Sequence, residues 1–79
     1  EEFLFLFENM NGDDAWNELS KLQLKINRLE IPYEDQIIHV TMTLGLTEYD
    51  SHISMDANIK QADDKLYKGK ESGRNRIVY

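Results

Sequence analysis

One spacing of apolar residues occurs twice along this 79-residue chain, and it restricts the possible folds more than any other feature. The intervals are 4, 3, 4 and 3 residues, which place apolar side chains along one face of a helix. The first set is Ala15, Leu19, Leu22, Ile26 and Leu29; the second is Met55, Ile59, Ala62, Leu66 and Gly69. The sequence therefore predicts two amphipathic helices, each with one face packed on a core.

Signals at the ends of these sets set the expected helix boundaries. Asp13 follows a turn-forming cluster and is a candidate N-cap for the first helix, which Pro32 should stop. Ser54 is a candidate N-cap for the second, which should run from about Met55 to Glu71. Gly73 then supplies a left-handed stop.

Three segments between and around these helices are typical of strands. Residues 3–7 are apolar at every position, which predicts a strand buried on both faces. Along residues 37–47, successive side chains face opposite sides and large apolar residues recur at every second position, which predicts a strand. Gly45 within this segment suggests a close approach of another backbone. Residues 76–79 form a last short strand. The order is strand, helix, strand, helix, strand, which predicts an α/β (α+β) layer of helices packed on a sheet.

Composition limits the class of protein. The length suits at most one small domain, and the absence of cysteine excludes disulfides and thiolate metal sites. No apolar run approaches the roughly 18 residues of a membrane span, so we expect no membrane contact by this segment. The net charge of −6 argues against binding nucleic acid.

Charge is nevertheless distributed unevenly along the chain. Residues 60–79 carry six Lys or Arg against three Asp or Glu, a balance of +3, which leaves −9 for residues 1–59. A basic end on an acidic body suits a small anion such as a nucleotide phosphate. Lys70 and Arg74 lie at the end of the second helix, where cations that merely cap the helix dipole are an open alternative. His39 is expected to be an ordinary strand histidine, because no second metal-type residue is spaced near it.

Three blocks of residues, at positions 62–76, 40–45 and 1–3, carry motifs that resemble those of one known family, the diguanylate cyclase GGDEF domain. The C-terminal block, Ala62-Asp63-x-x-Leu66-Tyr67-x-x-Lys70-x-x-Gly73-Arg74-Asn75-Arg76, is similar to the family's C-terminal signature. Residues 40–45, VTMTLG, resemble the family strand usually written VTVSIG. Residues 1–3, EEF, resemble the end of the GG[D/E]EF signature without its two glycines. The resemblance covers residues 1–79 as the C-terminal half of such a domain.

This resemblance implies an activity and a set of functional residues. Family members condense two GTP molecules into cyclic di-GMP and pyrophosphate, with Mg²⁺ (or Mn²⁺), between two facing domains of a homodimer. Glu1 matches the catalytic and metal-binding carboxylate, and Glu2 matches a position near the nucleotide. Lys70 and Arg74 match the cations that hold the GTP phosphates, and they share one side if the helical path continues through Gly73. The implied fold has a central, mostly antiparallel sheet.

The chain also departs from the family pattern at several positions. Lys65 stands where a small residue is usual, Gly69 where alanine is usual, and Thr43 where serine is usual. The family's N-terminal half, with a further metal ligand and the guanine-recognition residues, is absent from the sequence. We therefore expect a piece of a longer, cytoplasmic signalling protein, inactive as a cyclase by itself. Two alternatives remain: a non-catalytic domain that binds nucleotide or a partner, and a dimer formed by pairing of the exposed residues 3–7.

Overall fold

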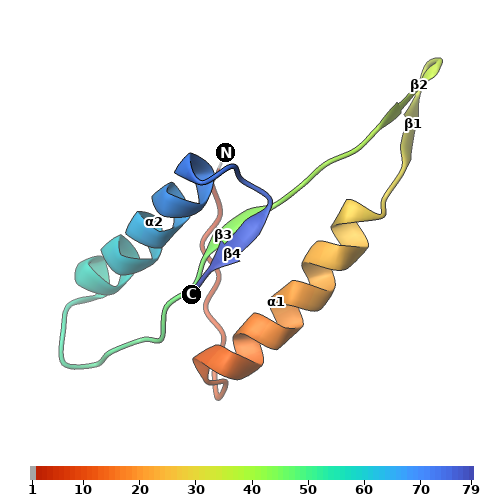
Figure 1. The fold of residues 1–79 in the computed structure, drawn as a ribbon. Coiled ribbons are helices and arrows are strands. Elements are labelled where there is room, and N and C mark those ends of the chain that lie inside the picture. The colour runs from red at the N-terminus through yellow and green to blue at the C-terminus, as the bar shows by residue number, and fades with distance from the viewer. Residues whose placement is uncertain (1) are drawn as a thin grey trace.

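The computed structural model describes residues 2–79 and confirms the mixed α/β class. Helix α1 (Gly12–Asn27) is followed by strands β1 (Ile31–Tyr33), β2 (Gln36–Ile38) and β3 (Thr43–Gly45). Helix α2 (Met55–Glu71) and strand β4 (Arg76–Val78) complete the order. Figure 1 shows α1 and α2 on opposite sides of the β3–β4 pair, with the β1–β2 hairpin projecting away from it.

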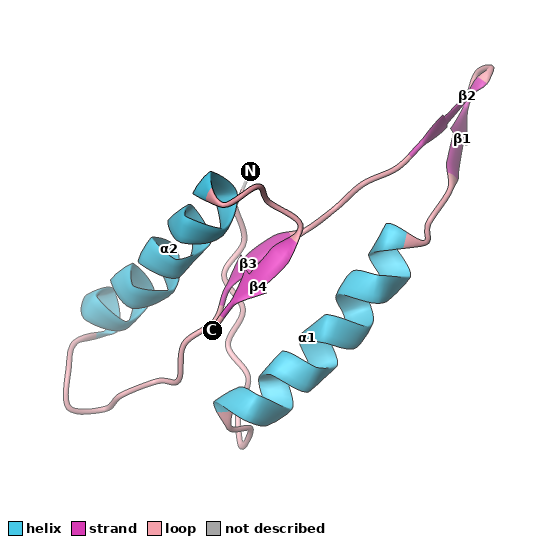
Figure 2. Cartoon of the chain, viewed as in Figure 1, coloured by secondary structure: helices cyan, strands magenta, loops and turns pink. Residues whose placement is uncertain are grey.

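The two strand pairs differ in direction. β1 and β2 form an antiparallel hairpin, in which Ile31 pairs with Ile38. β3 and β4 run parallel, with Thr43 opposite Arg76 and Gly45 opposite Val78. A parallel pair needs a crossover connection, and α2 supplies it. Figure 2 shows the long loops on either side of β3 that separate these elements.

Successive side chains of β3 point to opposite faces of the strand, one toward α2 and the other toward α1. A Cβ on Gly45 would lie 2.1 Å from the Ala62 carbonyl oxygen, so this face of the strand abuts the backbone of α2. Leu46 lies on the opposite face and is buried with Ala15 and Leu19 of α1, while Leu44 and Ile77 pack against them. The close approach predicted for Gly45 is confirmed, and the small core lies between α1 and the strands.

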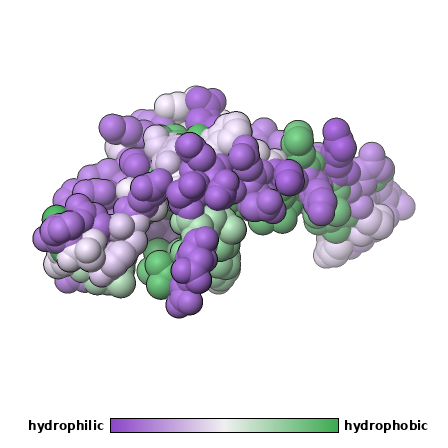
Figure 3. Space-filling view, turned by 90° about the horizontal axis from the view of Figure 1, so that it is seen from below, coloured by the Kyte–Doolittle hydropathy of each residue, from purple (hydrophilic) through white to green (hydrophobic). Residues whose placement is uncertain are grey.

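Most apolar residues lie outside this core. The accessible surface is 6518 Å², whereas a compact chain of this mass would expose about 5,000 Å². Residues 3–7 are 44–76% exposed, and in Figure 3 hydrophobic side chains reach the surface in several places. The molecule is correspondingly extended, at 52 × 25 × 18 Å.

The predicted boundaries were accurate for α2 and less so elsewhere. Ser54 caps α2 as predicted, and its hydroxyl accepts a hydrogen bond from the Ala57 N–H. The N-cap of α1 is Asn11 rather than Asp13, because the Asn11 side chain accepts from the Asp14 N–H. α1 also ends at Asn27, well before Pro32, which lies in β1 instead.

Two strand predictions were wrong in detail. Residues 37–47 do not form one strand, because their two ends take different partners: β1 for residues 36–38 and β4 for residues 43–45. Residues 3–7 form no strand and are not buried, because no other part of the described chain, residues 2–79, supplies a neighbouring strand.

Neither α1 nor α2, the helices of residues 2–79, has the length and apolar character that a membrane span requires.

Candidate functional site

The C-terminal end of α2 and the turn that follows form the candidate site. The Gly73 N–H donates to the Lys70 carbonyl at 3.4 Å, and the Arg74 N–H donates to the Gly69 carbonyl at 2.9 Å. These two bonds make a Schellman motif, which requires a left-handed residue after the helix. Gly73 provides it with φ of +114°, so the predicted glycine stop is confirmed.

The left-handed backbone continues beyond the glycine. Arg74 and Asn75 also have positive φ, 64° and 51°, a conformation that costs non-glycine residues free energy. Neighbouring elements hold the turn in place. The Asn75 N–H donates to the Thr43 hydroxyl at the start of β3, and the Asn75 side chain accepts from Gln23 of α1. Residues under backbone strain are frequent at binding sites, although strain alone does not identify one.

Lys70 is the half-buried cation of this site. Its ammonium lies 2.9 Å from the Glu2 carboxylate, and the two side chains are 33% and 58% exposed respectively. The hydrogen bond from Lys70, together with its charge, holds the pKa of the Glu2 carboxyl below its usual range. Glu2 therefore lies beside the C-terminal end of α2.

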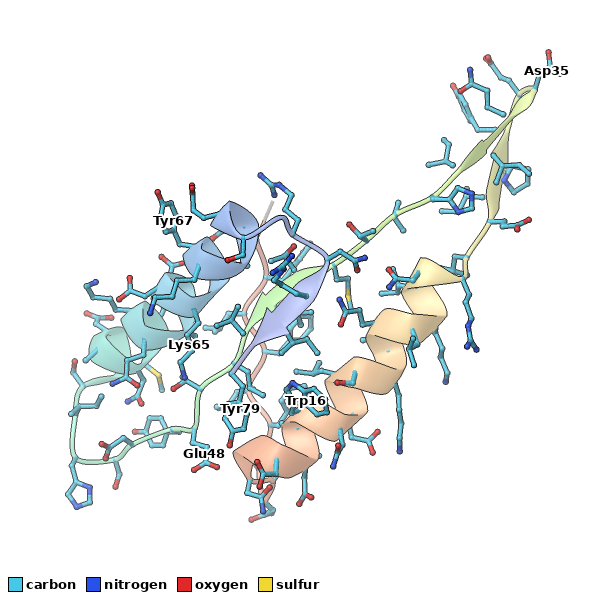
Figure 4. The ribbon with its side chains drawn as sticks, viewed as in Figure 1. Trp16, Asp35, Glu48, Lys65, Tyr67 and Tyr79 are labelled. Carbon is cyan, nitrogen blue, oxygen red and sulfur yellow. The ribbon has the colours of Figure 1, made fainter. Side chains whose placement is uncertain are left out.

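A small hollow surrounds this ion pair. It measures about 130 Å³ and is lined by Glu2, Asp63, Leu66, Tyr67 and Lys70. Four of these residues lie on one face of α2: Lys70 itself and the residues three, four and seven positions before it. Figure 4 shows Tyr67 projecting from this helix. The hollow thus brings one cation and two carboxylates together beside an aromatic ring.

Arg74 and Arg76 extend the positive charge around the turn. Both side chains are exposed, and the Arg76 Nε–H donates to the Arg74 carbonyl at 3.0 Å. Within residues 2–79, neither arginine forms an ion pair. Lys70, Arg74 and Arg76 at one end of a helix make a surface suited to phosphate oxygens, which Arg can bind in two places.

The structure places some of the predicted site residues together and leaves others apart or undescribed. Lys70 and Arg74 lie at the same end of α2, but the helical path does not continue through Gly73, so they are not related as helical neighbours. Glu2 lies at the site, in contact with Lys70. Glu1, the expected catalytic and metal-binding residue, lies outside the described residues. Asp63 and Tyr67 were missed, although their spacing from Lys70 already placed them on its face of α2.

The described residues do not by themselves form a metal centre. Among residues 2–79, no three His, Asp or Glu side chains gather in a way that could hold a metal ion. The described carboxylate nearest the predicted phosphate site, Glu2, is engaged with Lys70. The described residues alone therefore do not fit a metal site, and Mg²⁺ (or Mn²⁺) remains an expectation from the family resemblance.

A second polar cluster lies at the other end of the strands and is structural. Glu48 accepts hydrogen bonds from the Gly12 N–H at 2.7 Å and from the Tyr79 hydroxyl at 3.2 Å. Lys65 donates to the Leu46 carbonyl, and its ammonium lies 5.9 Å from the centre of the Tyr79 ring. Figure 4 labels Glu48, Lys65 and Tyr79. These contacts join the start of α1 to the end of β4. They also give Lys65 a packing role.

Comparisons with known proteins agree with the sequence motifs. Residues 1–76 match the model of the family described as diguanylate cyclase, GGDEF domain. The chain is 28% identical over 79 residues to diguanylate cyclase A of Treponema denticola, covering 99% of this chain and 21% of that protein. It is 27% identical to two Escherichia coli K12 proteins, DgcZ over 79 residues and DgcM over 78.

The chain spans only part of these relatives. It covers 27% of DgcZ and 18% of DgcM, while 100% and 99% of the chain is matched. No solved structure matches it. Because the family model matches nearly the whole sequence, the chain belongs to the diguanylate cyclase GGDEF domain family.

Proposed function

We propose that this chain forms the phosphate-binding half of a diguanylate cyclase domain that converts two GTP molecules into cyclic di-GMP and pyrophosphate. The observation that carries the proposal is the series of cations Lys70, Arg74 and Arg76, which runs from the last turn of α2 to the start of β4. The Schellman motif and the Thr43 contact hold the backbone between them. The three cations also coincide with the family's C-terminal signature. In this proposal Lys70 and Arg74 bind the phosphates of GTP, and the protein acts in the cytoplasm.

The chemistry assigned to the described residues is binding and charge neutralisation. Phosphoryl transfer is accelerated mainly by positioning the phosphates and stabilising their negative charge. Lys70 contributes a point charge and Arg74 a planar group with several N–H donors. The Schellman motif and the Thr43 contact fix the backbone that carries both cations, so little ordering is needed when phosphate binds.

The 79-residue chain by itself is proposed to lack cyclase activity. Its described residues provide phosphate-binding cations but no metal cluster. In the family, two facing domains each supply one GTP, so the active form is proposed to be a homodimer of complete domains. Glu1 is proposed as the catalytic and metal-binding carboxylate, with Glu2 near the nucleotide.

The test uses a complete GGDEF domain that has residues 1–79 as its C-terminal half. Cyclic di-GMP formed from GTP and Mg²⁺ is measured by chromatography for the wild type, Glu1→Gln, Lys70→Gln and Arg74→Gln. Lys60→Gln, which removes an exposed charge from the first half of α2, is the matched control. We expect turnover by the wild type and control, with large losses in the other three variants.

The same assay, together with a measurement of GTP binding by isothermal titration calorimetry, decides between this function and the alternative of a non-catalytic binding domain. GTP binding without turnover by the complete wild-type domain would favour the binding domain and refute the cyclase proposal. Cyclic di-GMP produced by the 79-residue chain alone would refute the proposed inactivity of the chain.

A further inference from the structure

We propose that Glu2 and the phosphates of the bound nucleotide compete for Lys70, so that the Glu2–Lys70 ion pair must open before phosphate engages this cation. The inference rests on the proposed function of Lys70 and adds a control of access to it. Glu2 is then an internal anion that occupies the phosphate site when nucleotide is absent, and its contact with Lys70 is autoinhibitory.

The two partners differ in how firmly they are held. Lys70 belongs to the last turn of α2, and its carbonyl takes part in the Schellman motif that ends the helix. Glu2 lies in a segment without regular secondary structure, and residues 2–10 make no backbone hydrogen bond within the described chain. Opening the pair therefore requires movement of Glu2 rather than of Lys70, and it breaks no secondary structure.

The charges in the hollow favour exchange over simultaneous binding. Lys70 is the single cation among its lining residues, while Glu2 and Asp63 are both carboxylates. A phosphate that approaches Lys70 is attracted by its ammonium and repelled by the carboxylate of Glu2, 2.9 Å from that ammonium, and by the carboxylate of Asp63 in the same hollow. Departure of Glu2 removes one source of repulsion and frees an N–H donor of Lys70, which has three in total.

The opposite role for Glu2 makes a contrary prediction. Because an ammonium has three donors, Lys70 has the capacity to bind Glu2 and phosphate together. Glu2 would then be a positioning residue that orients the ammonium, and its removal would weaken phosphate binding. Competition predicts that removal of the Glu2 charge strengthens binding, so the sign of the change separates the two roles.

The experiment measures binding of inorganic tripolyphosphate to the 79-residue chain by isothermal titration calorimetry, with and without Mg²⁺. The variants are Glu2→Gln, Lys70→Gln and the double variant. Glu71→Gln is the matched control, because Glu71 is an exposed carboxylate in the same helical turn and lies outside the hollow. Circular dichroism checks that each variant keeps the helix content of the wild type.

We expect Glu2→Gln to bind tripolyphosphate about two- to fivefold more tightly than the wild type, the range that corresponds to release from a partly exposed ion pair. Glu71→Gln should change the affinity by less than about twofold, since the Glu71 carboxylate is exposed to solvent and lies outside the hollow. Lys70→Gln should weaken binding about tenfold or more. In the Lys70→Gln background, Glu2→Gln should add no more than the Glu71→Gln control does.

The outcomes separate the two proposals. If Lys70→Gln weakens binding but Glu2→Gln behaves like Glu71→Gln or binds more weakly, the competition is refuted and the phosphate-binding role of Lys70 stands. If Lys70→Gln leaves the affinity unchanged, or if no variant binds tripolyphosphate, the phosphate site itself is refuted along with the competition. A gain in Glu2→Gln that persists without Lys70 would also refute the competition, because it would not act through the ion pair.

Discussion

Contact between α2 and β3 at Gly69 and Thr43 leads to a prediction about stability. A Cβ placed on Gly69 would lie 2.8 Å from Thr43 Cγ2 and 3.3 Å from Val78 Cγ2. Ordinary carbon–carbon contacts are about 3.5–4.0 Å. In this chain the methyl group is on the strand, at Thr43, and the facing helix position, Gly69, has none. We predict that the two residues compensate for each other.

The expected free energies follow from this geometry. Gly69→Ala gains about 1 kcal/mol of helix propensity but adds a methyl to filled space, which costs about 1–3 kcal/mol. The variant should therefore be unchanged or up to about 2 kcal/mol less stable. Thr43→Ser removes one methyl at a cost of about 1 kcal/mol, and its hydroxyl still accepts from the Asn75 N–H.

In the double variant the alanine methyl takes the space left by Thr43 Cγ2. Its stability should lie within about 1 kcal/mol of the wild type, giving a favourable coupling of about 1–2 kcal/mol. Urea unfolding followed by circular dichroism measures all four proteins. The reasoning fails if Gly69→Ala alone is stabilising by about 1 kcal/mol and the two changes add within about 0.5 kcal/mol.

Three further predictions concern single residues. Asn58 is 4% exposed, accepts from the Asp50 N–H and donates to the carbonyls of Asp50 and Ser54; Asn58→Leu should lose about 2–4 kcal/mol in urea unfolding, because these groups lose their partners. Gly73→Ala should cost about 1–2 kcal/mol in the same assay, since φ of +114° is strained for alanine. Partial burial first, and then the hydrogen bond to Glu48, raise the pKa of the Tyr79 phenol. Its stabilising contribution should be complete below pH about 10 and decline as pH rises through the raised value, so Tyr79→Phe should flatten the alkaline loss of stability.

Sequence reasoning succeeded where the structure depends on local signals. The limits of α2 follow from Ser54, the apolar spacing and Gly73, all of which lie within or beside the helix. The face on which each β3 side chain lies was also predictable, because successive residues of a strand point to opposite sides and Gly45 is therefore opposite to Leu44. These features need no knowledge of distant contacts.

Features that depend on distant partners were not predictable. An apolar run such as residues 3–7 is buried only if other strands cover it, and its own sequence does not say whether they do. The Glu2–Lys70 pair joins residues 68 positions apart, so no spacing rule indicates it. The division of residues 37–47 between two pairs likewise depends on β1 and β4 rather than on the segment itself.

The parallel pairing of β3 and β4 across α2 has a consequence for the order of folding. All contacts within β3, α2 and β4 are made inside a continuous stretch of 36 residues, from Thr43 to Val78. Short loops close at lower entropic cost than long ones. This β–α–β unit is therefore suited to form early and to serve as the template on which α1 docks. Its amide hydrogens should be the slowest to exchange with solvent, while those of the projecting β1–β2 hairpin should exchange first.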